Sequence, residues 1–252
     1  MPLPGYRSAP AEPQPAGIES RGAELVTGSA DRSTAALQAV MFDMDGLLVD
    51  SEPLWFQAEG AVMARLGGSW LPADQHALVG GSMPSTVKYL LSKGTRPADP
   101  AAVANWLIDA MVDLIGSAPL PVLPGALELV MEVAAAGMPY ALVTSSEPAV
   151  MEAVLAQLEV PFPVTVCAAD VARAKPDPEG YLLAAAKLGA DPRRCIAVED
   201  SPNGVAAAEA AGYRTVAVPS VVPVPERPGR VVLATLAGIS LAGLAALTGL
   251  GA

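Results

Sequence analysis

Histidine and cysteine are scarce in this sequence of 252 residues, which has one histidine and two cysteines. A single histidine, His76, nearly excludes Ser-His-Asp catalysis and zinc sites built from several histidines. Cys167 and Cys195 lie within apolar runs, and neither belongs to a C-x-x-C motif. We therefore expect two buried free thiols and a cytoplasmic location, rather than a disulfide or a metal site.

Positive charge is also scarce. The chain has 15 Lys and Arg residues against 26 Asp and Glu residues, which gives a formal net charge of −11. This balance argues against nucleic acid or an anionic membrane as a partner. A phosphorylated substrate would need local positive charge on the protein.

Charged residues are missing altogether from the last 22 residues, 231–252. By hydropathy alone this segment could be a membrane span. Four glycines, one serine and two threonines interrupt it, and no basic cluster flanks its far end. We expect a last strand over 231–233 and a short helix on the core, with no membrane partner.

The first 36 residues lack the basic and apolar regions of a secretory signal. They are rich in Pro, Ala, Gly and Ser and show no sustained periodicity. This composition predicts a disordered N-terminal extension over residues 1–36.

Short apolar segments alternate with helical patterns after residue 118. Strands are expected over 140–143, 164–167, 196–198 and 215–218, in addition to a first strand that begins at residue 39. Capping residues mark the helices between them; for example, Asp177 is expected at the N-cap of one helix. This alternation predicts an α/β fold with a Rossmann-like parallel sheet covered on both faces.

A helical block interrupts this alternation directly after the first strand. Apolar residues recur at helical spacing between 53 and 118, and a glycine-containing loop over 80–83 divides them. We therefore expect an α/β core formed by residues 37–52 and 119–252, with an inserted α-helical cap over 53–118.

The segment Asp43-Met44-Asp45-Gly46 follows the first strand with two carboxylates and a glycine. Strand residues alternate faces, so Asp43 and Asp45 leave the backbone on the same side, about 6–7 Å apart. Like charges at that spacing repel each other unless a cation lies between them. Taken alone, the motif indicates either a metal and phosphate site or an ordinary Asp/Gly turn.

Polar side chains also follow other strands of the expected sheet. Residues 144–146 offer hydroxyls and amides for a phosphate oxygen, Glu199 and Asp200 form a second acidic pair, and Lys175 is a lone cation. Each group alone has an ordinary explanation as a strand terminator, a helix cap or a solvated charge. Together, at the carboxyl ends of parallel strands, they favour one ligand site, and their acidic oxygens favour Mg²⁺.

In order and spacing, these residues resemble the four motifs of the haloacid dehalogenase superfamily. The four motifs correspond to residues 43–52, Thr144, residues 175–178 and residues 199–204. The helical block is similar to the small α-helical cap of the branch that holds phosphoglycolate phosphatase-like and β-phosphoglucomutase-like enzymes. Residues 51–55 look most like those of sugar- and sugar-alcohol-phosphate phosphatases.

The resemblance implies a mechanism. Asp43 would be the nucleophile that forms an aspartyl-phosphate, and Asp45 would act as general acid and then as general base. Mg²⁺ would bind Asp43, the main-chain carbonyl of Asp45, and Asp200, with Glu199 in or near its coordination shell.

The same resemblance implies where a small phosphorylated substrate would bind. The phosphoryl group would contact the hydroxyl of Thr144 and the ammonium of Lys175, with Ser145 beside them. The cap would close over the site, and its expected specificity residues are Gly80, Gly81, Ser82 and Met83.

Some positions depart from the mutases of this branch. Trp55 stands where a histidine is expected, and Met83 stands where a cap arginine is expected. The charges nearest to them are the acids Glu52, Glu59 and Asp74. These departures weigh against transfer of the phosphoryl group to a second sugar hydroxyl.

The sequence therefore predicts a Mg²⁺-dependent phosphatase acting on a sugar or polyol phosphate. Dehalogenases of the superfamily lack an acid at the position of Asp45, and Ala174 replaces a common glycine before the lysine. A hexose-phosphate mutase and a catalytically inactive ligand-binding protein are the two alternatives. The sequence indicates neither the exact substrate nor an oligomeric state.

Overall fold

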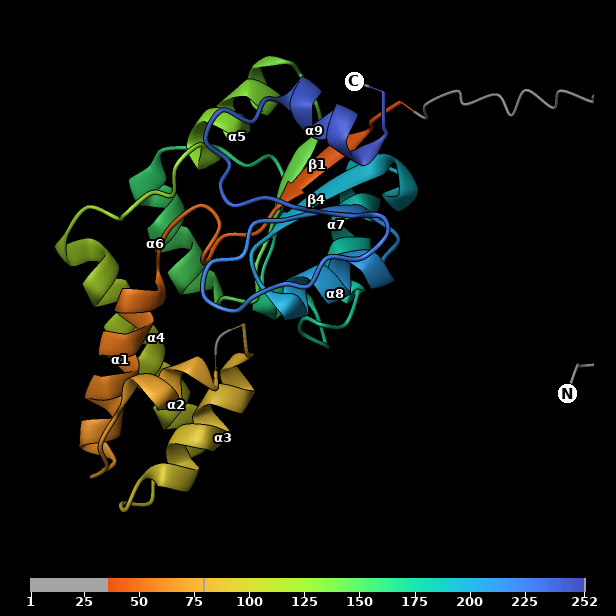
Figure 1. Cartoon of the computed structure of the whole chain (residues 1–252). Coiled ribbons are helices and arrows are strands. Elements are labelled where there is room, and N and C mark those ends of the chain that lie inside the picture. Colours follow the sequence, from red (N-terminus) through yellow and green to blue (C-terminus); the bar gives the residue numbers. More distant parts are fainter. Residues whose placement is uncertain (1–35, 79, 252) are drawn as a thin grey trace, which may run out of the picture. The chain divides into compact units, whose positions relative to one another are not determined.

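The computed structural model describes residues 36–78 and 80–251. The extension expected over residues 1–36 lies outside the described residues except for Ala36. Within the described part, a parallel sheet is covered by helices, so the predicted α/β class is confirmed (Figure 1).

The sheet has the strand order β3-β2-β1-β4-β5-β6, and each neighbouring pair is parallel. Its strands are β1 (Ala39–Phe42), β2 (Tyr140–Val143), β3 (Thr165–Val166), β4 (Cys195–Glu199), β5 (Arg214–Ala217) and β6 (Arg230–Val232). The chain order reverses at β1, which lies between β2 and β4. In open α/β sheets, ligands bind beyond the carboxyl ends of the strands at such a reversal.

Alternate side chains of β1 enter separate hydrophobic clusters on the two faces of the sheet. Val40 and Phe42 share one cluster with α5, α6 and α9, whereas Ala39 and Met41 share the other with the alanine-rich helices α7 and α8. These helices are α5 (Ala126–Ala135), α6 (Pro148–Leu158), α7 (Glu179–Leu188), α8 (Pro202–Ala210) and α9 (Leu241–Thr248). Burial on both faces explains why the central strands are continuous apolar runs.

In the described part of the chain, four consecutive helices separate β1 from α5. They are α1 (Glu52–Arg65), α2 (Pro72–His76), α3 (Met83–Lys93) and α4 (Pro100–Ser117). Helices α1 and α4 contact each other, and α4 also contacts α6 of the sheet layer. Ala58 and Val62 on α1, with Val103 and Leu107 on α4, recur at helical spacing and are buried. This apolar stripe holds the helical block together.

Helix α7 begins one residue later than the capping pattern predicts. Pro178, not Asp177, is the N-cap, and the helix starts at Glu179. Asp177 still accepts a hydrogen bond from the backbone N–H of Glu179 at 3.1 Å. The expected strand over 164–167 is likewise shorter and has only two residues, Thr165–Val166.

The C-terminal segment forms the expected short helix, α9 (Figure 1), and a strand, β6, that begins at Arg230, one residue before the expected strand, and ends at Val232. In the part of the chain that the structure describes, no helix is both long and apolar enough to cross a membrane. Cys167 and Cys195 are buried free thiols, as predicted.

Candidate active site

Three carboxylates meet where β1 and β4 end. These two strands pair in parallel with Phe42 opposite Val198, so the residues that follow are neighbours. Oxygen atoms of Asp43, Glu199 and Asp200 lie within 4.8 Å of one another, and all three residues are buried. The sheet thus brings together acidic residues that are more than 150 positions apart in the sequence.

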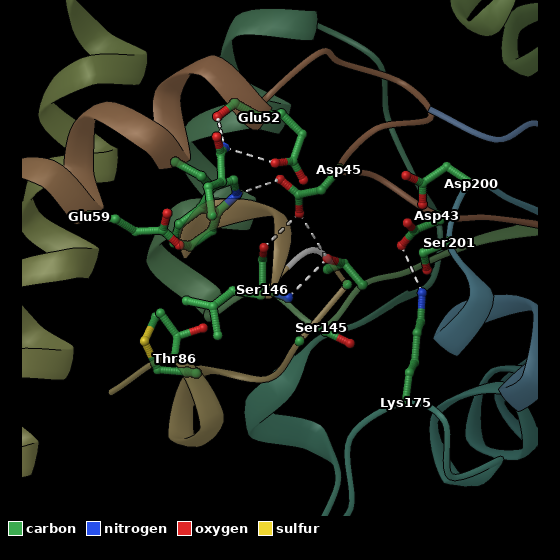
Figure 2. A pocket seen from close by; sticks show the side chains of 17 residues that line it. Asp43, Asp45, Glu52, Glu59, Thr86, Ser145, Ser146, Lys175, Asp200 and Ser201 are labelled. Atoms are coloured by element: carbon green, nitrogen blue, oxygen red, sulfur yellow. Dashed lines mark hydrogen bonds and ion pairs between the residues drawn. The ribbon is translucent and has the colours of Figure 1, made fainter. Parts of the chain in front are cut away.

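Lys175 lies against this acidic cluster. Its ammonium donates to Asp43 Oδ1 at 2.7 Å (Figure 2), to Glu199 Oε1 at 2.5 Å and to the carbonyl oxygen of Val143 at 2.8 Å. All three of its hydrogens therefore have acceptors. Burial alone would lower the pKa of Lys175, but the two carboxylates raise it above its ordinary value. Lys175 is thus a fixed positive charge beside Asp43.

Glu199 is fully buried, and both of its carboxylate oxygens accept hydrogen bonds. Oε1 accepts from Lys175 and from the hydroxyl of Tyr181 at 2.7 Å, while Oε2 accepts from the backbone N–H of Asp200 at 3.2 Å. A Cβ at Gly204 would lie 1.9 Å from Glu199 Oε2, so the carboxylate packs directly on the start of α8. Glu199 positions Lys175, whereas Asp43 and Asp200 line the open pocket.

The acidic cluster carries more negative than positive charge. Burial and the neighbouring Glu199 raise the pKa of Asp43 from 3.8 to about 7. Burial and the charge of Asp43 also raise the pKa of Asp200 well above its usual range. Buried oxygen donors with surplus negative charge fit a divalent cation such as Mg²⁺.

The loop after β1 is shaped to bring Asp200 close. Gly46 has a φ of +74°, and a Cβ there would lie 2.1 Å from Asp200 Oδ2. Any side chain at this position would therefore strain the turn and displace the carboxylate. Ser220, in the loop after β5, donates to the same Oδ2 at 2.6 Å. Sequence patterns did not mark Ser220 as part of the site.

The carboxylate of Asp45 points away from the acidic cluster and is held by donors on both sides (Figure 2). Oδ1 accepts from Ser51 Oγ at 2.6 Å and from Trp55 Nε1 at 3.3 Å. Oδ2 accepts from Ser146 Oγ at 2.6 Å and from Thr144 Oγ1 at 3.4 Å. Asp45 is therefore fixed between the end of β2 and the start of α1.

The hydroxyl residues after β2 have different positions in the site. Thr144 Oγ1 accepts from the backbone N–H of Ser146 at 3.0 Å, which stabilises the turn. Ser145 lines the pocket, as do Thr144 and Ser146. The sequence did not predict the hydrogen bond from the Ser146 hydroxyl to Asp45. Three consecutive hydroxyl residues gave no indication of which hydroxyl would reach the carboxylate.

The helical block forms the other wall of the pocket. Its lining residues are Glu52, Trp55, Glu59, Gln75, Leu78, Gly80, Gly81, Met83 and Thr86. Three of the four expected specificity residues are among them. The fourth, Ser82, is instead the N-cap of α3. Asp74 is also elsewhere, bound to Lys93 and to Tyr89.

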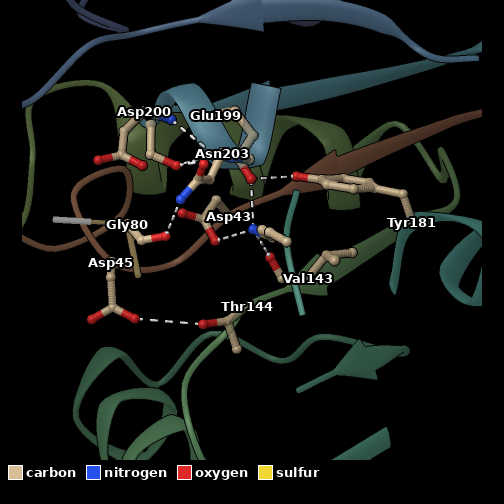
Figure 3. A network of polar contacts seen from close by, with 12 residues as sticks. Asp43, Asp45, Gly80, Val143, Thr144, Tyr181, Glu199, Asp200 and Asn203 are labelled. Atoms are coloured by element: carbon tan, nitrogen blue, oxygen red, sulfur yellow. Dashed lines mark hydrogen bonds and ion pairs between the residues drawn. The ribbon is translucent and has the colours of Figure 1, made fainter. Parts of the chain in front are cut away.

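A direct contact links this wall to the sheet layer. Asn203, at the start of α8, donates from Nδ2 to the carbonyl oxygen of Gly80 at 2.8 Å (Figure 3). Gly80 has a φ of +69°, and a Cβ there would lie 3.2 Å from Cβ of Ser201. The loop at Gly80 therefore lies close against the edge of the acidic cluster.

Comparisons with known proteins agree with this geometry. A family model of haloacid dehalogenase-like hydrolases matches residues 37–212. The chain is 36% identical over 215 residues to hexitol phosphatase B of Escherichia coli (strain K12), covering 82% of this chain and 94% of that protein. It is 32% identical over 205 residues to the plasmid protein CbbY of Cupriavidus necator, covering 73% and 79% of the two chains.

A similar solved structure is that of a CbbY mutant from Rhodobacter sphaeroides in complex with xylulose-(1,5)bisphosphate. It matches with a TM-score of 0.77 and 29% identity, over 82% of this chain and 99% of that one. The matched range contains both acidic pairs, the hydroxyl turn and Lys175. The chain belongs to the haloacid dehalogenase-like hydrolases.

Proposed function

We propose that this protein is a Mg²⁺-dependent phosphatase that hydrolyses a sugar or sugar-alcohol monophosphate through an aspartyl-phosphate intermediate. The observation that carries this proposal is the position of Asp43. Its buried carboxylate belongs to a three-carboxylate cluster, accepts a hydrogen bond from Lys175, and lines the same pocket as Asp45. One pocket therefore offers both a nucleophile and a candidate acid.

Asp43 and Asp200 would hold the cation together with the main-chain carbonyl of Asp45. The acidic donor set and its surplus negative charge fit such an ion. When bound, Mg²⁺ would screen the anionic substrate from the carboxylates and stabilise charge in the transition state.

The chemical steps use Asp43 and Asp45. An oxygen of Asp43 attacks phosphorus, the bond from phosphorus to the leaving oxygen breaks, and Asp45 gives that oxygen its proton. Asp45 then takes a proton from water, which attacks the phosphoryl group and releases phosphate from Asp43. Hydroxyls can both donate and accept, so those of Ser51 and Ser146 can hold Asp45 in either protonation state.

The phosphoryl group would lie at the core wall of the pocket, against Thr144, Ser145 and Lys175. Among the described residues that line the pocket, Lys175 is the one with a cationic side chain. Its fixed charge needs no reorganisation when negative charge builds up on the phosphoryl oxygens. The rest of the substrate would then extend toward the helical wall.

Hydrolysis is favoured over a mutase reaction. A mutase must hold a second phosphate while the first is transferred, which requires cationic groups on the helical wall. The described lining residues from 52 to 86 include no Lys, Arg or His. The similarity to hexitol phosphatase B further supports a polyol phosphate as substrate.

Phosphate release tests the proposal. With Mg²⁺, the protein should release inorganic phosphate from hexitol 6-phosphate, and excess chelator should abolish turnover until Mg²⁺ is restored. Ca²⁺ should restore it poorly, because it tolerates extra ligands and looser geometry. Full activity in excess chelator would contradict the metal requirement. With a hexose 1-phosphate, faster formation of hexose 6-phosphate than of phosphate would contradict the phosphatase assignment.

A further inference from the structure

Glu59 is a buried carboxylate on α1 that the proposed chemistry does not use. Its side chain lines the pocket on the helical wall, and the residue is 4% exposed (Figure 2). Among the described residues, its Oε2 atom has no hydrogen-bond partner. The indole N–H of Trp70, which likewise lacks a partner of good geometry among these residues of the described chain, is a neighbouring donor that acts to lower the pKa of Glu59. One donor leaves a carboxyl group with further lone pairs, so Glu59 keeps capacity at the pocket wall for a hydrogen bond from a ligand.

The environment of Glu59 disfavours its charge. Burial, followed by the nearby Glu52, raises the pKa of Glu59 from 4.5 to about 8. A buried carboxyl group with few donors destabilises the fold, and a hydrogen bond from a bound molecule would offset that cost. Glu59 is therefore better placed to bind a ligand than to stabilise the free protein.

Neighbouring groups on this wall are also suited to hydroxyl recognition. Glu52 Oε2 accepts a hydrogen bond from Gln75 Nε2 at 2.9 Å, which fixes a second carboxylate at the pocket. Thr86 is a further lining residue, it is buried, and it carries a hydroxyl. Carboxyl groups form hydrogen bonds with hydroxyls, and the described residues of this wall include no cation that would pair with a phosphate or carboxylate. The wall thus favours an uncharged polyhydroxylated chain.

We propose that Glu59 is a specificity-determining residue that accepts a hydrogen bond from a hydroxyl of the leaving group. With Glu52, it selects an uncharged polyol or sugar, since the described residues of this wall offer no cation to a leaving group that carries a second anion. This inference rests on the proposed phosphatase function and adds the feature of the leaving group that is recognised. A site built around a hydrogen bond to a substrate hydroxyl rejects analogues that lack it, because its own polar group is then left unpaired.

Two variants separate the roles of the acceptor and of the charge. Glu59→Leu removes both, whereas Glu59→Gln keeps an acceptor oxygen and removes the charge. Asp109→Asn is the matched control, because Asp109 is an exposed acid on α4 that does not line the pocket. The substrates are hexitol 6-phosphate, 4-nitrophenyl phosphate, which has no aliphatic hydroxyls, and a phosphorylated sugar acid, which carries a second anion.

Glu59→Leu should lower kcat/KM for hexitol 6-phosphate by roughly 10–100-fold and change that for 4-nitrophenyl phosphate by less than about threefold. Glu59→Gln should keep most activity on the hexitol phosphate and, at pH 9, where Glu59 of the wild type is charged, raise activity on the sugar-acid phosphate. The control should match the wild type on all three substrates. Equal losses on the hexitol and aryl phosphates, or no loss on either, would overturn the inference.

The design distinguishes this inference from the proposed function. If the wild-type protein releases phosphate from neither the hexitol nor the aryl ester, the phosphatase assignment fails, and the inference fails with it. If the wild type hydrolyses both esters but the Leu variant loses no selectivity, only the role of Glu59 is wrong. Should Glu59→Leu misfold, the activity ratio of the Gln variant on neutral and anionic leaving groups decides the question.

Discussion

The two walls of the pocket differ in how their polar groups are satisfied. On the sheet side, Lys175 has three acceptors and Asp45 has four donors. On the helical side, Glu59 Oε2 has no partner of good geometry within the described part of the chain, and its neighbouring donor is the indole N–H of Trp70. The sheet side is therefore ordered before substrate arrives, while part of the helical side is completed by what binds.

This contrast separates chemistry from selectivity. A phosphoryl group is the same in every substrate, so the groups that hold it can be fixed by the protein itself. Leaving groups differ, and the residues that face them need free hydrogen-bonding capacity. Changes on the sheet side should therefore affect all substrates equally, whereas changes on the helical side should affect some substrates more than others.

The largest effect should come from Asp43→Asn. An amide cannot attack phosphorus, so kcat should fall by at least about 10⁴-fold on every phosphate ester. The variant should remain folded, because the side chain keeps its size and loses a buried charge. Phosphate release and circular dichroism measure the two properties. Activity near that of the wild type would show that Asp43 is not the nucleophile.

Asp45→Asn is the companion to that variant. It should also lose most activity, but it lacks the base that activates water in the second step. Phosphorylated protein should therefore accumulate and be detectable by mass spectrometry. The Asp43→Asn variant should never become phosphorylated, and a phosphorylated form of it would contradict the assigned roles.

Glu59 should also have a measurable effect on stability. The pKa of Glu59 rises from its ordinary value of 4.5 to about 8 in the folded protein. Between these two pH values the folded protein therefore keeps a proton on Glu59 that the unfolded chain has released. The free energy of unfolding therefore falls as pH rises through this window. We expect Glu59 to account for roughly 2–4 kcal/mol of the loss between pH 5 and pH 8.

Glu59→Gln isolates this contribution, because the amide does not titrate. Urea unfolding at pH 5 and pH 8 should show a smaller decrease for the variant than for the wild type. Asp109→Asn should keep the decrease of the wild type. If Glu59→Gln and the wild type lose stability equally between the two pH values, Glu59 is charged at little cost, and its burial does not disfavour the carboxylate.

The sequence was sufficient to predict the sheet and the groups at its edge. Short apolar runs predicted the strands, and parallel topology alone places Asp43, Thr144 and Asp200 at one end of them. Lys175 was marked by its isolation in a segment with few charges. These residues could be predicted because each follows a strand or opens a loop, which are positions that local patterns reveal.

Residues inside helices and distant loops could not be predicted in this way. The sequence placed Glu59 among the acids nearest to Trp55 and Met83, but its neighbours Ala58 and Gly60 on α1 do not indicate that it is buried and faces the pocket. The sequence pattern around Tyr181 indicates an ordinary apolar residue of α7, and the pattern around Ser220 indicates an ordinary polar residue in a loop. Their roles depend on which side chain from another element lies opposite, and that depends on packing.

The smallest effect should come from Tyr181→Phe, which tests how far the fixed sheet side depends on its supporting bonds. The hydroxyl of Tyr181 donates to Glu199 Oε1 at 2.7 Å, and Glu199 in turn holds Lys175. Without that hydroxyl, Glu199 still accepts from Lys175, so kcat should fall by only about 2–10-fold, and equally on all substrates. Stability should fall by about 1 kcal/mol, the usual cost of one buried hydrogen bond.

Tyr213→Phe is the matched control, because it removes a buried hydroxyl that donates to the carbonyl oxygen of Tyr181 at 2.8 Å and not to Glu199. It should lose similar stability without losing activity. If both variants lose activity to the same extent, general loosening of the fold explains the effect, and the bond to Glu199 has no special part in placing Lys175.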